Sequence, residues 1–317
     1  MKLTKLYIHN YKSFYDTTIE LDKMNIVVGE NNSGKSNLID VLEFIDIALT
    51  KDVHSAVVDK GGWDKIINYN SQEDKIIIEF ELENKKDLQK IQLTVEEKLW
   101  YQSTITYSEI AKTYAFNTET IRSKSHEKLD VALQKDGRNL GENLFYIKSN
   151  SPEKFEIISN SMIGIVNEID GVDVKEVFGR YLIGFKEKNR IIGIDDVSDG
   201  TINLLATITA LNQEDDKSIL LAFDEPERYL HLKAVNYLLE SFRASEKQIL
   251  ITTHSTEILK YANLDEIVFI YRDSDGDTQS IRANKIDGLK DMLKELSYER
   301  DLTLDELIAD GVIGDFK

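Results

Sequence analysis

The sequence predicts an α/β protein built on a mostly parallel sheet, with an antiparallel β subdomain and a helical insert. Three observations predict this class. A glycine-rich G-x-x-x-x-G-K-S motif lies between a short apolar run and a segment with helical periodicity. Residues 75–107 alternate between apolar and polar side chains, as the strands of an antiparallel sheet do. In the last third of the chain, strand-like apolar runs alternate with helical patterns, which favours parallel strands.

Composition and charge narrow the function. The 317 residues are 41% hydrophobic and 30% charged, as in globular proteins, and the absence of cysteine excludes disulfides and thiolate metal sites. No apolar run approaches the roughly 20 residues that span a bilayer, and the first residues do not form a signal peptide. We therefore expect a cytoplasmic protein without a membrane partner. The net charge of −18 excludes a protein that binds nucleic acid through a generally basic surface. It is still compatible with a local basic groove of the protein that contacts DNA.

The first fifty residues predict two strands, a phosphate-binding loop and a helix. The apolar run 26–28 predicts the buried strand before the loop, and a helix follows it. The helix is predicted by apolar residues at helical spacing, namely Leu38, Val41, Leu42, Ile45 and Leu49. A glycine turn that matched the motif by chance would not have both flanking elements. We therefore interpret the motif as a phosphate loop.

The residue types of this loop suit a nucleotide. Gly29 and Gly34 allow a tight backbone turn, so that successive N–H groups converge on one point. The helix that opens at Lys35 adds the positive end of its dipole. Lys35 can reach the β- and γ-phosphates, and the Ser36 hydroxyl can bind Mg²⁺. The nucleotide-binding residues predicted here are Gly29, Asn31, Asn32, Ser33, Gly34, Lys35, Ser36 and Asn37.

The middle of the chain carries weaker signals. The alternating segment 75–107 predicts an antiparallel sheet beside the loop. Residues 105–150 are polar and irregular, and we expect them to be the most mobile region. Apolar spacing predicts a helix over 152–169. Strands are predicted over 177–185 and 190–194.

The last third predicts a helix from Thr201, a strand over 218–223, a helix from about His231 and a strand over 248–252. The tail from residue 284 onward is predicted to be helical and acidic. The strand 218–223 is followed by two carboxylates. Beside a phosphate loop, Asp224 can hold the Mg²⁺ shell, and Glu225 can polarise the attacking water. Without the phosphate loop, two carboxylates at this position would indicate only the solvent-exposed end of a strand.

Two further motifs are ambiguous by themselves. Ser198 is an expected N-cap, and Gly200 lets backbone amides approach a ligand, but an ordinary capped helix explains both residues equally well or better. His254 follows a buried strand at the edge where α/β sheets bind ligands, so it either senses a γ-phosphate or is structural. The acidic run 273–277 lies between two strand-like segments, which favours a hairpin turn over a metal site.

The order of these motifs resembles that of the ABC-class ATPase heads of the SMC, RecF and OLD (overcoming lysogenization defect) group. The resemblance covers nearly the whole chain. The motifs that carry it are Asn10–Phe14, Gly29–Asn37, Asp136–Leu140, Ser198–Thr201, Phe223–Glu227 with Leu230–His231, and Thr252–Ser255. It implies one ATPase domain over residues 1–317, with a phosphate-loop lobe (1–110), a helical insert (111–190) and a signature lobe (191–317).

The resemblance also implies roles for residues. Ser198, Gly200 and Thr201 would belong to the ABC signature, which touches the γ-phosphate of ATP held by another subunit. Glu225 would be the catalytic base, assisted by Lys35, and His254 the switch histidine.

The same resemblance implies further contacts and some departures. Lys12, in the motif before the loop, would contact the nucleotide, and Glu227–His231 would begin the D-loop. Leu232 stands where many relatives carry proline, which leaves the D-loop turn undefined. Gln72 is the candidate for the glutamine that completes the Mg²⁺ site.

Several features of related proteins are absent from the sequence. It has no heptad-patterned coiled coil and no transporter signature, and 63 residues follow His254, too few for the nuclease domain of OLD proteins. The resemblance implies a partner, because relatives with bare heads of this size often pair with a nuclease or toxin. We therefore expect an ATP-gated homodimer or higher oligomer that controls a separate effector in anti-phage defence or DNA repair. The alternatives are a RecF-like DNA-binding protein and an ATP-bound scaffold with little turnover.

Overall fold

The computed structural model describes residues 1–317 apart from 85–86, 97–108, 124–131, 167–168, 214–216 and 290–317. The chain forms two compact units that are interleaved along the sequence. Unit 1 comprises Met1–Thr113, Lys217–Asp224 and Glu246–Lys317, and unit 2 comprises Tyr114–Asp216 and Glu225–Ser245. Among the residues that the structure describes, no helix has both the length and the apolar character needed to cross a bilayer.

Unit 1 contains a six-stranded sheet in the order β13-β12-β3-β11-β10-β6. The four central strands, β12, β3, β11 and β10, run parallel, and β13 is antiparallel to β12. The strands are β3 (Met24–Val28), β6 (Ala111–Tyr114), β10 (Leu220–Asp224), β11 (Gln248–Thr253), β12 (Ile267–Arg272) and β13 (Thr278–Arg282). The central strands are buried on both faces, which is why they appear in the sequence as continuous apolar runs rather than alternating ones.

A second sheet of unit 1 is antiparallel, in the order β2-β1-β4-β5. Its strands are β1 (Lys2–Tyr11), β2 (Phe14–Glu20), β4 (Lys75–Glu83) and β5 (Leu88–Glu96). Alternate residues of β4 are buried, as expected for a sheet with one face on the core. This confirms the predicted antiparallel sheet as far as residue 96, and residues 97–107 lie outside the described part.

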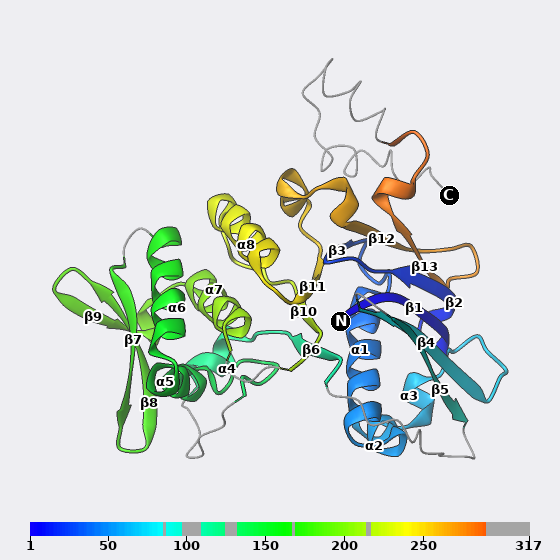
Figure 1. The fold of residues 1–317 in the computed structure, drawn as a ribbon, viewed down its shortest axis with the longest axis horizontal. Helices are drawn as coiled ribbons and strands as arrows, with labels where there is room; N and C mark the ends of the chain where they lie inside the picture. The colour runs from blue at the N-terminus through cyan, green and yellow to red at the C-terminus, as the bar shows by residue number, and fades with distance from the viewer. Residues whose placement is uncertain (85–86, 97–108, 124–131, 167–168, 214–216, 290–317) are drawn as a thin grey trace. The chain divides into compact units, whose positions relative to one another are not determined.

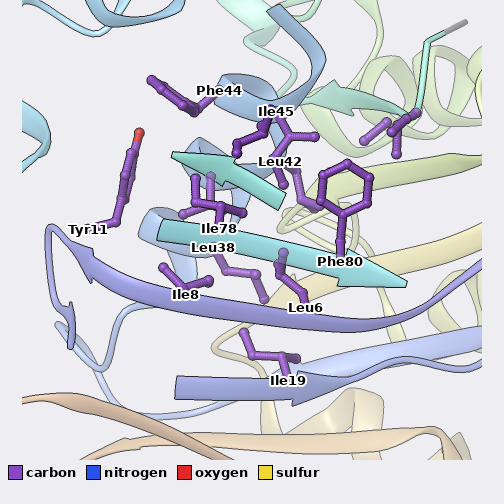
Figure 2. Packing of buried hydrophobic residues seen from close by; sticks show 14 of the residues in the cluster. Leu6, Ile8, Tyr11, Ile19, Leu38, Leu42, Phe44, Ile45, Ile78 and Phe80 are labelled. Carbon is purple, nitrogen blue, oxygen red and sulfur yellow. The ribbon is translucent and has the colours of Figure 1, made fainter. Parts of the chain in front are cut away.

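The hydrophobic core of unit 1 lies between this sheet and the helix that follows the glycine-rich loop (Figure 2). That helix is α1 (Lys35–Thr50), and two short helices follow it, α2 (Val53–Asp59) and α3 (Trp63–Ile66). The side chains that meet there include Leu6, Ile8, Leu38, Leu42, Ile78 and Phe80. Burial of these apolar side chains anchors the first turn of α1, and thereby the loop before it.

Unit 2 is formed by helices and one small antiparallel sheet in the order β7-β8-β9. The helices are α4 (Thr118–Arg122), α5 (Leu140–Asn150), α6 (Pro152–Ile165), α7 (Asp199–Leu211) and α8 (Leu232–Ala244). The strands are β7 (Gly171–Val177), β8 (Arg180–Glu187) and β9 (Arg190–Gly193). In Figure 1 α5 and α6 lie beside this sheet, and residues of both helices contact β7.

The structure corrects several sequence-based expectations. Residues 105–150 are not uniformly irregular, because β6, α4 and α5 lie among them. In α5, Leu140, Leu144 and Ile147 have helical spacing and are buried, although polar neighbours dominate the segment. The strand predicted over 177–185 is interrupted by a turn at Phe178 and Gly179, both at positive φ. The helix predicted over 152–169 ends at Ile165.

Two more differences concern the start and the end of the chain. Three strands, not two, precede the glycine-rich loop, because the first segment folds into the β1–β2 hairpin. The predicted lobes 1–110, 111–190 and 191–317 do not coincide with the two units, because the last third supplies strands to unit 1 and helices to unit 2. Most of the predicted helical tail, 290–317, lies outside the described residues.

Candidate nucleotide-binding site

Three neighbouring parallel strands of unit 1 end at the same edge of the sheet. Asp224 at the end of β10 pairs with Thr252 of β11, and Thr252 pairs with Val27 of β3. The glycine-rich loop follows β3, His254 follows β11, and Glu225 follows β10. Ligands of open α/β sheets bind at this edge, outside the carboxyl ends of the strands.

The backbone of the loop requires glycine at two positions. Gly34 has φ of 114°, and a Cβ built there would lie 2.5 Å from Thr278 Oγ1. A Cβ at Gly29 would lie 2.1 Å from the carbonyl oxygen of Ile270. Asn32 also adopts a left-handed conformation, with φ of 65°, which asparagine tolerates better than most residues. The loop is therefore packed closely against β12 and β13.

The polar groups of the loop fit a triphosphate. The Lys35 ammonium donates to the carbonyl oxygens of Gly29 (2.6 Å) and Glu30 (2.7 Å), so it lies over the loop. Ser33 is 3% exposed, and its hydroxyl has no hydrogen-bond partner among the described residues. A buried hydroxyl without a partner is rare and costly, and a phosphate oxygen in the loop would satisfy it.

Oxygen ligands suitable for Mg²⁺ come from two elements. Ser36 is exposed at the start of α1, and Asp224 is half-buried at the end of β10. The hydroxyl of Thr252 donates to Asp224 Oδ1 over 2.5 Å, which fixes the carboxylate. No group of three or more His, Cys, Asp or Glu in the described part of the chain could hold a metal alone. Mg²⁺ commonly combines one or two protein oxygens with phosphate oxygens and water, and Ser36 and Asp224 fit that pattern.

Glu225 and His254 occupy the ends of their strands, as the sequence predicts. Glu225 is half-buried and has φ of 49°, so the backbone turns sharply after β10. His254 is exposed directly after β11, where the amide of Ser255 donates to Thr253 Oγ1 over 2.9 Å. Their catalytic and switch roles remain predictions.

The signature residues lie in unit 2 at the start of α7. Ser198 is the N-cap, as predicted, because its hydroxyl accepts from the amide of Thr201 over 3.1 Å. A Cβ at Gly200 would lie 2.4 Å from the carbonyl oxygen of Tyr229, so only glycine fits there. Asn203 donates to the carbonyl oxygens of Pro226 (3.0 Å) and Arg228 (3.1 Å). The signature helix is thus bound to the segment that follows Glu225, the predicted D-loop.

Arg122 is a residue of this region that the sequence did not reveal. It lies at the end of α4, donates to the carbonyl oxygen of Val197 (2.8 Å) and pairs with Asp199 (2.7 Å). The hydrogen bond from Arg122 lowers the pKa of Asp199. Because 77 residues separate Arg122 from Asp199, no local sequence pattern indicates the contact.

Two residues predicted for the site, Lys12 and Gln72, lie outside the loop and the strand ends described above. The Lys12 ammonium pairs with Asp40 of α1 over 2.5 Å. Asp40 also accepts from Tyr11 and pairs with Lys60. Although burial raises the pKa of Asp40, these partners together hold it below its usual value. Gln72 is exposed in the segment before β4. The roles of Lys12 in nucleotide contact and of Gln72 at Mg²⁺ remain predictions.

Comparison with known proteins assigns the family. The family model described as "AAA domain, putative AbiEii toxin, Type IV TA system" matches residues 24–260, which include the loop, the signature, both strand-end carboxylates and His254. The chain belongs to this AAA family. Over 79 residues the chain is 39% identical to the Old nuclease of Escherichia phage P2. The match covers 24% of this AAA-family chain and only 14% of the length of that nuclease.

Solved structures of SMC heads have a similar fold. The SMC head domain from Thermotoga maritima has a TM-score of 0.55 at 17% identity, covering 89% of this chain and 99% of that chain. An Smc head from Pyrococcus furiosus, bound to the C-terminal domain of ScpA, has a TM-score of 0.60 at 16% identity, covering 93% and 99%. Another Smc head, bound to the C-winged helix domain of ScpA, has a TM-score of 0.62 at 18% identity, covering 89% and 98%. The AAA-family chain therefore has the fold of an SMC head.

Proposed function

We infer that this chain binds Mg-ATP, associates with a second copy of itself around the nucleotide, and hydrolyses ATP to release that association. The observation that carries the proposal is the loop itself. The Lys35 side chain donates to two of its carbonyl groups, and the buried Ser33 hydroxyl has no hydrogen-bond partner in the described part of the chain. Asp224 ends a strand at the same sheet edge.

Each residue has a role that its position supports. The backbone from Gly29 to Asn37 and the Lys35 ammonium would bind the phosphates. Ser36 and Asp224 would hold Mg²⁺, which neutralises phosphate charge when bound. Glu225 would accept a proton from the attacking water, and His254 would contact the terminal phosphate.

The signature supports the association. Ser198 is exposed at the N-terminus of a 13-residue helix, where backbone N–H groups and the helix dipole favour an anion. We propose that Ser198, Gly200 and Thr201 of one protomer contact the γ-phosphate held by its partner. A two-fold arrangement completes both sites with one self-complementary surface. Because the γ-phosphate bridges the protomers, its loss by hydrolysis would favour the open state.

A separate effector completes the proposal. Two of the similar SMC heads were solved with a domain of ScpA bound, so heads of this fold can carry a partner protein. We propose that this chain controls an effector, such as a nuclease or toxin, in anti-phage defence or DNA repair. The net charge of −18 makes direct and general DNA binding the weaker alternative.

The molar mass of the purified protein tests this function. We expect a dimer or larger assembly with Mg²⁺ and a non-cleavable ATP analogue, and a smaller species with ADP. Light scattering after size exclusion separates the two. A monomer under saturating analogue, with no companion subunit present, would overturn the proposal.

A further inference from the structure

The β12–β13 hairpin contacts the phosphate loop through two side chains that no motif contains. Thr278, the first residue of β13, lies 2.9 Å from the carbonyl oxygen of Ser33 through its hydroxyl and is completely buried. Arg272, the last residue of β12, donates from Nε to the carbonyl oxygen of Asn32 over 2.9 Å. Arg272 also donates to the carbonyl oxygen of Gly276 in the turn of the hairpin, over 2.6 Å.

These bonds fix the orientation of two peptide groups. A trans peptide is planar, so its N–H points away from its carbonyl. Arg272 donates to the carbonyl oxygen of Asn32. The N–H of the same peptide group belongs to Ser33 and donates to the carbonyl oxygen of Glu30, which closes the turn of the loop. Thr278 binds the Ser33 carbonyl, so the N–H of Gly34 is directed to the opposite side. Backbone N–H groups whose direction is fixed in this way can form an anion-binding concavity.

The Thr278 hydroxyl is itself held in a directed chain. It lies 2.8 Å from the Ser13 hydroxyl, and the Asn37 side-chain amide donates to Ser13 over 2.8 Å. A hydroxyl carries one proton, and the Ser33 carbonyl can only accept. The chain is therefore satisfied when Asn37 donates to Ser13, Ser13 to Thr278, and Thr278 to Ser33.

We propose that the β12–β13 hairpin is a brace that presets the phosphate loop for nucleotide, with Thr278 and Arg272 as positioning residues. The brace holds the loop's carbonyls before nucleotide arrives, so less ordering is needed on binding. Its effect on affinity rests on the proposed function, whereas its effect on the loop itself does not.

The matched experiment compares two buried threonines of the full-length chain. Thr278→Val removes the hydroxyl that holds the loop, and Thr278→Ser keeps it. Thr17→Val is the control, because the Thr17 hydroxyl donates to the Thr278 carbonyl and is equally buried, but among the described residues it makes no hydrogen bond to the loop. Arg272→Ala tests the second contact at a partly exposed site.

Two measurements decide the proposal. Without nucleotide, amide hydrogen exchange over residues 30–34 should become roughly tenfold faster in Thr278→Val and in Arg272→Ala, as expected for loss of one hydrogen bond. Binding of a fluorescent ATP analogue should weaken by about the same factor, with kcat at saturation changed much less. Thr278→Ser should match wild type in both, and Thr17→Val should lower thermal stability alone.

The proposal is overturned if Thr278→Val and Thr17→Val have the same loop exchange and the same affinity. A wild-type protein that binds no ATP analogue would refute the proposed function instead. In that event the exchange measurement still decides whether the hairpin braces the loop.

Discussion

The hydroxyl of Thr252 donates to Asp224 Oδ1 over 2.5 Å, between two adjacent parallel strands whose residues at these positions pair directly. Thr252 is completely buried and Asp224 is half-buried, so the donor side of the bond is shielded from water. It links the strand that precedes His254 to the strand that precedes Glu225. A carboxylate that is fixed in this way is preorganised for a cation.

This bond predicts the behaviour of Thr252→Val. The carboxylate of Asp224 loses a buried donor, so we expect the Mg²⁺ concentration for half-maximal ATP turnover to rise by roughly tenfold. Thr252→Ser should retain the wild-type value because it keeps the hydroxyl. A magnesium titration of turnover checks this, and an unchanged half-saturation in Thr252→Val would contradict a role of Asp224 at the metal.

Lys35→Ala should weaken nucleotide binding severely. The ammonium is 4% exposed and donates to two carbonyl oxygens of the loop, so its loss removes a cation and loosens the loop. Charge-assisted bonds of this kind correspond to a loss of roughly 100-fold in affinity. Equilibrium titration with a fluorescent ATP analogue measures it, with circular dichroism to verify folding. Normal affinity would remove Lys35 from the site.

Glu225→Gln should bind ATP normally but hydrolyse it about 10²- to 10⁴-fold more slowly, because the amide cannot accept a proton from water. The variant should therefore accumulate as the ATP-bound assembly. Phosphate release in single-turnover experiments and molar mass in ATP provide the two readouts. Hydrolysis at the wild-type rate would assign the base to another group.

Ser198→Arg should leave ATP binding intact and prevent association, because a long cation replaces an exposed hydroxyl at the helix start. A mixing experiment tests the composite site. A heterodimer of Ser198→Arg with Lys35→Ala pairs one intact loop with one intact signature, so mixing should restore some turnover that neither variant has alone. Failure of the mixture to exceed both separate variants would count against a site shared between protomers.

The stability of unit 1 should depend on the ionisation of His9. The His9 ring lies between Asp16 (2.9 Å) and Glu73 (3.0 Å). Burial alone lowers the pKa of His9, but the hydrogen bonds to Glu73 and Asp16 outweigh it and raise the pKa above 6.5. This stabilisation is complete below the unfolded value of about 6.5 and is lost as pH rises through the folded pKa.

His9→Gln should therefore reduce the loss of stability between pH 6 and pH 9. Urea unfolding at both pH values gives the free energy of unfolding for the variant and for wild type. An equal loss in both proteins would show that His9 is not the group that titrates in this range.

Local patterns predicted the parts of the site that lie within a few residues of one another. The apolar run before Gly29, the helix after Lys35 and the Ser198 cap all depend on short-range geometry, and the structure confirms them. The acidic segment 273–277 is the predicted hairpin turn, in which Asp273 accepts from the amides of Asp275 and Asp277. Polar side chains hid the buried stripe of α5, so the sequence missed that helix.

The sequence alone determined the fold class, because each motif lies in a continuous stretch with its own strand or helix. Only the tertiary structure revealed that Thr278 and Arg272 hold the phosphate loop, that Arg122 holds the segment before the signature, and that Lys12 pairs with Asp40. Most of these contacts join residues far apart in the chain. Their partners are set by which strands and helices pack together, and no spacing along the sequence encodes that.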